Sequence, residues 1–405
     1  MPESLGLLTR PRRGRFWLAA LAALPTCVLA CQSKPLDDTT SSAAGSAGLG
    51  GANANLGGAS DSDAGMPAGD ASGAGGAGGQ AETLSILERV EISSDASAEH
   101  FQRADADVDF GQQPVTRAVL RVTLASPCFP FAGWAEPGVP AQQRWPALCD
   151  AFDRTVSVTM DEADPPSETA PAVELLRAIT PFGGPLQVET DVTDVVNGLP
   201  GVHRVGIRID TWSDADGLVS GSNGQWIASL DLELWRGAAP RRVLAVVPLV
   251  LAAQTEADAA PLTFEVPDGV GSAHIEYRVT GHGGAFGLGC SGPAEEFCRR
   301  THELSLDGEP LQELVPWRDD CATLCTITQN DSGYGPASYC AENPCGDPRS
   351  VRAPRANWCP GSMTPPFVIE APALAVAGPH ELLRRIPELA KGGLWTVSAT
   401  YFAFE

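Results

Sequence analysis

The sequence is short of basic residues, of histidine and of helical periodicity. Lys and Arg number 27 against 50 Asp and Glu, and the resulting formal charge of -23 argues against nucleic acid as a partner. The six histidines stand apart, with no His-His, His-x-His or His-x-Met pair, and an HExxH motif is absent. We therefore expect no metal and no cofactor.

The N-terminus has the pattern of an export signal. Arg10, Arg12, Arg13 and Arg15 precede an apolar run at 16–30 that is too short to cross a bilayer. The run ends in Val28-Leu29-Ala30-Cys31, which resembles a bacterial lipobox. This predicts a lipoprotein signal peptide at 1–30 and lipidation of Cys31, with the membrane contacted through the anchor alone and the protein facing the periplasm or the cell surface. The alternative is simple secretion, with Cys31 as an ordinary thiol.

Residues 31–82 form a low-complexity segment of Gly, Ala, Ser, Asn and Asp with hardly an aromatic or β-branched residue. Such a composition cannot bury enough apolar surface to offset the entropy of ordering the chain. We interpret it as a flexible tether that holds the folded part away from a membrane.

The rest of the chain alternates apolar and polar residues with period two, which is typical of half-buried strands. The clearest such segments are 118–124, 156–160, 203–212, 229–235, 274–279, 302–308 and 394–404, whereas 378–390 is the single stretch that predicts a helix. Many short strands between Gly- and Pro-rich loops predict an all-β fold of two antiparallel, eight-stranded jelly-roll sandwiches in series. The break at 237–240 places the N-terminal domain at 83–239 and the C-terminal domain at 240–405.

Nine of the eleven cysteines lie in the folded part. In an exported protein the default is disulfides, and the odd count leaves at least one cysteine without an intramolecular partner. A four-thiolate zinc site in CATLC and CAENPC is a weaker alternative, because the spacings are irregular and the compartment is oxidising.

Seven short motifs resemble the peptide-N-glycosidase F family in order and approximate spacing. They are RAITPF (177–182), DVTD (191–194), DTW (210–212), AVVPLV (245–250), EFCRRTH (296–302), CAENP (340–344) and RANWCPG (355–361). The resemblance covers nearly all of residues 84–405. It implies two side-by-side jelly rolls and hydrolysis of the amide bond between asparagine and the innermost N-acetylglucosamine of an N-glycan, leaving aspartate.

The resemblance also implies the catalytic residues. CDAFDR places Asp153 where the family has its principal catalytic aspartate, and Glu296 matches a second essential carboxylate that works through a bridging water. Asp210 stands where the family has a longer glutamate. Amide hydrolysis needs a group that activates water and a proton source for the departing nitrogen, and paired carboxylates from the two domains supply both. We therefore expect the site in a cleft between the jelly rolls.

Other residues are implied to surround the substrate or to hold the loops. Substrate-binding roles fall to Arg154, Trp212, Arg300, His302, Arg355 and Trp358. The implied disulfides are Cys128–Cys149, Cys290–Cys298 and Cys340–Cys359, each beside a site residue.

The sequence thus predicts a monomeric deglycosylating amidase of N-glycoproteins or glycopeptides. A second hypothesis is a surface lipoprotein of the same fold that binds glycans or glycopeptides with weak or no catalysis. In that case Asp210, in place of the glutamate of the family, would indicate lost catalytic activity. A third, a copper-dependent monooxygenase of related fold, is disfavoured because the histidines are scattered.

Overall fold

In the computed structural model, residues 81–135, 145–163, 170–212, 224–284 and 289–405 are described. The predicted signal peptide, Cys31 and nearly all of the tether lie outside these residues. Within the described ranges the protein is almost entirely antiparallel β-sheet, as predicted. None of the helices in this part of the chain combines the length and the apolar character needed to span a bilayer.

The N-terminal half forms two sheets. The first has the order β1-β8-β3-β6, with bounds Glu82–Ser93, Gln225–Arg236, Val115–Ala125 and Leu186–Asp191. The second has the order β16-β5-β4-β7-β2, with bounds Ser362–Met363, Val173–Ile179, Thr155–Met160, Val202–Ile209 and Arg103–Asp109. One member of the second sheet, β16, comes from the C-terminal half and pairs with β5.

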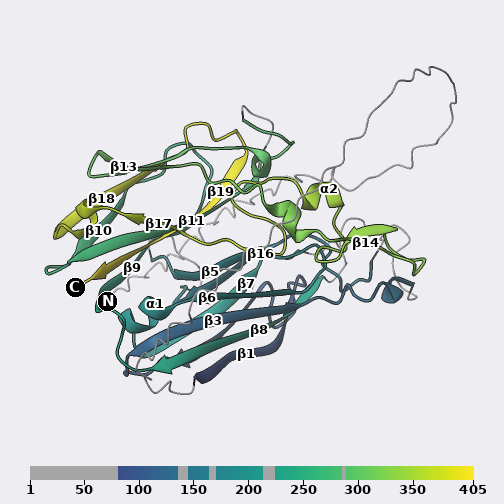
Figure 1. Cartoon of the computed structure of the whole chain (residues 1–405), viewed down its shortest axis with the longest axis horizontal. Coiled ribbons are helices and arrows are strands. Elements are labelled where there is room, and N and C mark those ends of the chain that lie inside the picture. Colours follow the sequence, from purple (N-terminus) through teal and green to yellow (C-terminus); the bar gives the residue numbers. More distant parts are fainter. Residues whose placement is uncertain (1–80, 136–144, 164–169, 213–223, 285–288) are drawn as a thin grey trace, which may run out of the picture.

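The C-terminal half forms two further sheets. One has the order β17-β11-β19-β9, with bounds Phe367–Glu370, Ser272–Gly283, Gly393–Phe404 and Val243–Gln254. The other has the order β10-β18-β12-β13, with bounds Leu262–Val266, Gly378–Arg385, His302–Leu306 and Glu309–Leu314. Figure 1 shows the two halves side by side, with β5 and β16 next to the sheet of β11 and β19.

Small elements connect the sheets. They are α1 (Thr193–Gly198), α2 (Pro348–Val351), the hairpin β14–β15 (Ile327–Gln329 and Ser338–Cys340) and the 3-10 turns η1 to η4 (Phe131–Ala135, Glu295–Phe297, Cys321–Leu324 and Pro372–Ala375).

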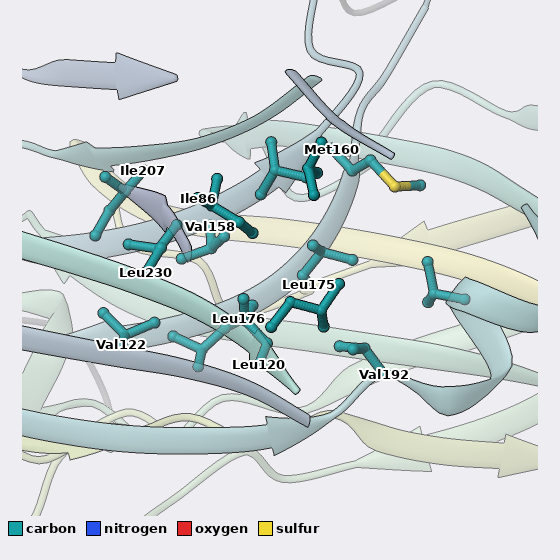
Figure 2. Close-up of a cluster of buried hydrophobic side chains, with 14 of the residues drawn as sticks. Ile86, Leu120, Val122, Val158, Met160, Leu175, Leu176, Val192, Ile207 and Leu230 are labelled. Carbon is teal, nitrogen blue, oxygen red and sulfur yellow. The ribbon is translucent and has the colours of Figure 1, made fainter. Parts of the chain in front are cut away.

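Each half has its own apolar core, built from the alternation seen in the sequence. In β3 the side chains of Leu120, Val122 and Leu124 are buried while those of Arg121 and Thr123 are exposed. They meet inward-facing residues of the opposite sheet in the first core (Figure 2). Val246, Phe402 and Phe404 also join this core, although they belong to the C-terminal half. The halves therefore share apolar surface, and the domain boundary at 239/240 stays a prediction.

The strand β5 is buried along its whole length because its second face packs against the C-terminal half. There Glu174 and Arg177 form a fully buried ion pair, with Arg177 Nη2 2.8 Å from Glu174 Oε2. Arg177 Nη1 donates to the Thr396 carbonyl at 2.7 Å, and Arg278 Nη1 donates to the Glu174 carbonyl at 2.9 Å. This network fixes how the two sandwiches sit against each other.

The predicted helix at 378–390 is wrong: residues 378–385 form strand β18. His380, Leu382 and Arg384 point inward while their neighbours face out. β10 and β12 pair with the two edges of β18, so pairing and burial outweigh the helical pattern of the segment.

Candidate active site

Asp153 lies in a short loop that leads into β4. The Cys128–Cys149 disulfide, expected from the resemblance, holds the start of this loop. Its end is held by Arg154, whose backbone N–H donates to Thr180 Oγ1 at 2.8 Å. Asp153 is half-buried, two residues before the strand begins.

Glu296 lies in η2 of the C-terminal half, between the cysteines of the expected Cys290–Cys298 bridge. Its carboxylate Oε1 accepts a hydrogen bond from Arg355 Nη1 at 2.7 Å. Its backbone carbonyl accepts one from the Ala356 N–H, also at 2.7 Å. Segment 355–358 and η2 are thus tied together through both side chain and backbone.

The structure brings Asp153 and Glu296 within range of each other's charge. Burial raises the pKa of Asp153, with the positive charges of Arg355 and Arg154 acting against it. Burial also raises the pKa of Glu296 to about 7; the guanidinium of Arg355 opposes this rise and the negative charge of Asp153 adds to it. The arrangement is a pair of interacting carboxyl groups with one arginine close to both.

Arg154, Phe152 and Trp212 form a second group on the N-terminal side. The guanidinium carbon of Arg154 lies 5.1 Å from the centre of the Phe152 ring and 5.4 Å from the Trp212 ring. The two rings stack at 6.5 Å and 26°. Trp212 is 40% exposed, so its indole can meet a ligand.

Asp210 follows directly after β7, which ends at Ile209 rather than running to 212 as the pattern suggested. Its backbone N–H donates to the Thr155 carbonyl at 3.1 Å, which places it next to the start of β4. The residue keeps exposed surface. Desolvation by the surrounding protein nevertheless raises its pKa, against the positive charges of Arg208 and Arg154.

Five of the six predicted substrate-binding residues are buried: Arg154 is 8% exposed, and Arg300, His302, Arg355 and Trp358 are at most 1% exposed, whereas Trp212 is exposed. Trp358 is 1% exposed, donates from Nε1 to the Gly281 carbonyl and stacks on His282. Arg300 is paired with buried Glu295. His302 is bound to Tyr277 and packs on Trp395.

His302 and Trp358 each have a defined interior environment. Burial lowers the pKa of His302 to about 3, so that the ring is neutral at ordinary pH. The ring of Trp358 lies 4.4 Å from the guanidinium carbon of Arg355 and braces it.

One of the expected disulfides is wrong. Cys359 pairs with Cys321, and Cys340 pairs with Cys325, in place of the predicted Cys340–Cys359 bridge. The bridge to Cys359 still holds the segment that carries Arg355 and Trp358. Since Cys321, Cys325 and Cys340 are in disulfides, the four-thiolate zinc site does not form, and Cys345 is the free cysteine among the described residues.

Two residues that the sequence reasoning missed hold the arginines in place. Asp150 accepts from Arg154 Nε, and Ser350 accepts from Arg355 Nη2 through both its carbonyl and its hydroxyl oxygen, at 2.9 and 3.0 Å. The spacing of Asp150 and Arg154 at i, i+4 was visible in the sequence. However, an i, i+4 spacing predicts a side-chain contact only within a helix, and these two residues lie in a loop.

Comparison with known proteins places this geometry in context. Residues 251–402 match the family described as "Peptide-N-glycosidase F, C terminal". The structure of PNGF-II aligns with a TM-score of 0.58 and 18% identity over 80% of this chain, which spans 65% of the PNGF-II chain. PNGase F, a glycosylasparaginase from Flavobacterium meningosepticum, aligns with a TM-score of 0.59 and 17% identity over 80% of this chain and 96% of its own. No curated protein sequence matches the chain.

Proposed function

We propose that the protein is a glycoamidase, because residues 251–402 match the C-terminal family model of peptide-N-glycosidase F and the described chain has the fold of PNGase F. It hydrolyses the amide bond between asparagine and N-acetylglucosamine in N-glycoproteins or glycopeptides, releases the glycan and leaves aspartate. The observation that carries the proposal is the charge interaction between Asp153 of one half and Glu296 of the other, with Arg355 bonded to Glu296 and its charge acting on both.

The paired carboxyl groups fit the chemistry of amide hydrolysis. Two neighbouring, partly desolvated carboxyl groups do not both ionise readily, so at neutral pH the pair retains a proton. One group then accepts a proton from the attacking water, and the other donates one to the departing nitrogen. We assign the acceptor role to Asp153 and the donor role to Glu296, which also holds the water and the first sugar.

The surrounding side chains suit a sugar substrate. Trp212 presents an exposed indole face for stacking on a pyranose ring, and Arg154 supports it from behind. Arg355 is itself buried, and its positive charge beside both carboxyl groups favours negative charge developing nearby. Asp210 contributes a third carboxylate, one methylene shorter than the glutamate of the family.

We further propose that the protein is exported and anchored by lipid at Cys31. Its four disulfides fit an oxidising compartment. The tether would hold the site away from the membrane, within reach of glycoproteins.

The test uses the purified protein and a denatured N-glycoprotein. We expect free glycan, together with conversion of the glycosylated asparagine to aspartate detected by mass spectrometry of the peptide. Asp153→Asn should lower the rate by about 100-fold or more, whereas Asp107→Asn, an exposed aspartate on β2, should not change it. Glycopeptide binding without mass change would reject the amidase and favour a glycan-binding module.

A further inference from the structure

Asp150 is a buried carboxylate in the middle of the candidate site. It is 1% exposed and directly follows Cys149 of the first disulfide. Its two oxygens lie 3.0 and 2.9 Å from Arg154 Nε, which gives a charged contact with both oxygens. The Phe152 N–H donates to its Oδ1 at 3.3 Å, so the carboxylate also shapes its own loop.

The same carboxylate reaches a second loop. Thr211 Oγ1 donates to Asp150 Oδ2 at 2.5 Å, and Trp226 Nε1 of β8 lies 3.4 Å from that oxygen. Thr211 is fully buried and stands between Asp210 and Trp212, both of which are exposed. A single side chain therefore joins the loop of Asp153 and Arg154 to the loop of Asp210 and Trp212.

The charge of this group matters as well as its shape. Burying a carboxylate is costly unless a counter-ion and hydrogen-bond donors compensate it. Here Arg154 supplies the counter-ion, and a hydroxyl, an indole and a backbone N–H supply donors. Packing leaves little freedom for movement, since a Cβ added at Gly224 would lie 3.3 Å from the Asp150 Cβ.

We propose that Asp150 is a positioning residue of the glycoamidase site, which fixes Arg154 against Phe152 and Trp212 and locks the two loops in register. This inference rests on the proposed function. Asp150 acts through Arg154 and Thr211 and does not touch the substrate.

A consequence for proton transfer follows from the charges around Asp153. Burial raises the pKa of Asp153, the positive charges of Arg355 and Arg154 lower it, and the negative charge of Asp150 raises it. Asp150→Asn removes the negative charge that raises the pKa of Asp153, so this pKa falls. The acid limb of the pH–rate profile should therefore move to lower pH in this variant.

The experiment compares three variants of the full chain: Asp150→Asn, Thr211→Val and the exposed control Asp107→Asn. For Asp150→Asn we expect kcat/KM for glycan release to fall by about 10 to 100-fold with the shifted acid limb. Thr211→Val keeps the charge of Asp150 and should raise KM without moving the pH profile. The control should match the parent. An Asp150→Asn protein with the parent's rate and profile, or with reduced activity but an unshifted acid limb, overturns the proposal.

Hydrogen–deuterium exchange separates this inference from the proposed function. If the parent releases no glycan, the glycoamidase proposal fails, yet the coupling of the loops is still measurable. Asp150→Asn should speed exchange in peptides covering 150–155 and 209–212 while leaving those of β11 and β19 unchanged. Unaltered exchange at 209–212 overturns the positioning role whether or not the protein is an enzyme.

Discussion

Arg355 and Glu296 are joined by a 2.7 Å hydrogen bond from guanidinium Nη1 to carboxylate Oε1, although they are 59 positions apart in the chain. The Ala356 N–H, next along the chain, binds the Glu296 carbonyl. The second amino group of Arg355 is held by Ser350. Glu296 is consequently fixed in orientation even though burial and the charge of Asp153 favour its protonated form.

The titration of Glu296 should report on Asp153. The negative charge of Asp153 adds to the rise in the pKa of Glu296 to about 7, so Asp153→Asn should lower this pKa. NMR titration of the Glu296 carboxyl carbon measures the change directly. Asp107→Asn serves as the control and should leave the value near that of the parent. An unchanged titration in Asp153→Asn would mean that the two carboxyl groups do not interact.

Substitutions of Trp212 and Trp358 should have different effects, one on substrate binding and the other on stability. Trp212 is 40% exposed, so Trp212→Ala should raise KM for a glycopeptide and leave thermal stability nearly unchanged. Trp358 is 1% exposed and bonded to Gly281, so Trp358→Ala should cost about 3 to 5 kcal/mol of stability. Urea unfolding and steady-state kinetics on both variants provide the measurement. Equal losses of stability would contradict the assignment of Trp212 to the binding surface.

The cysteine pairing has a chemical test. Peptide mapping without reduction should recover Cys321–Cys359 and Cys325–Cys340, with Cys345 as a free thiol. Burial raises the pKa of the Cys345 thiol, so iodoacetamide should label this residue slowly in the native protein and rapidly in urea. Cys345→Ser should preserve all four disulfides. Recovery of a Cys340–Cys359 peptide would restore the original expectation.

The buried pair Glu174–Arg177 should matter more as a pair than as separate residues. Arg177→Met leaves the carboxylate of Glu174 buried without its main counter-ion and should destabilise the protein by about 3 to 5 kcal/mol. Adding Glu174→Met should recover part of that loss, because the double variant no longer buries the unpaired carboxylate of Glu174. A double-mutant cycle in urea measures the coupling. Strictly additive losses would show that the pair is not coupled.

Period-two alternation predicted the strands correctly where one face is buried, as in β3 and β4, because burial of one face dictates that pattern. It failed at β18, where inward-facing Arg384 breaks the apolar series and the segment imitates a helix. The Cys128–Cys149 and Cys290–Cys298 disulfides were expected correctly. Cys359 was assigned the wrong partner because sequence spacing contains no information on how a 38-residue connection folds back.

The roles of Asp153, Glu296 and Arg355 stay predictions from the motifs, and the burial of their motif neighbours was not foreseen. Arg300 and His302 carry polar side chains, which in a sequence indicate surface or site. The structure buries both, since Glu295 neutralises the first and desolvation keeps the second uncharged. A polar residue next to a site in the sequence can thus be buried in the protein core, and only the contacts in the structure show this.

The pairing of β16 with β5 affects the order in which the chain can fold during synthesis. Ribosomes make the N-terminal half first, but the outer edge of β5 stays open until residues 362–363 have emerged. Phe402 and Phe404, made later still, then complete the first core. An open strand edge invites pairing with other chains. A fragment ending near residue 239 would thus be prone to aggregate, because it lacks residues 362–363, Phe402 and Phe404.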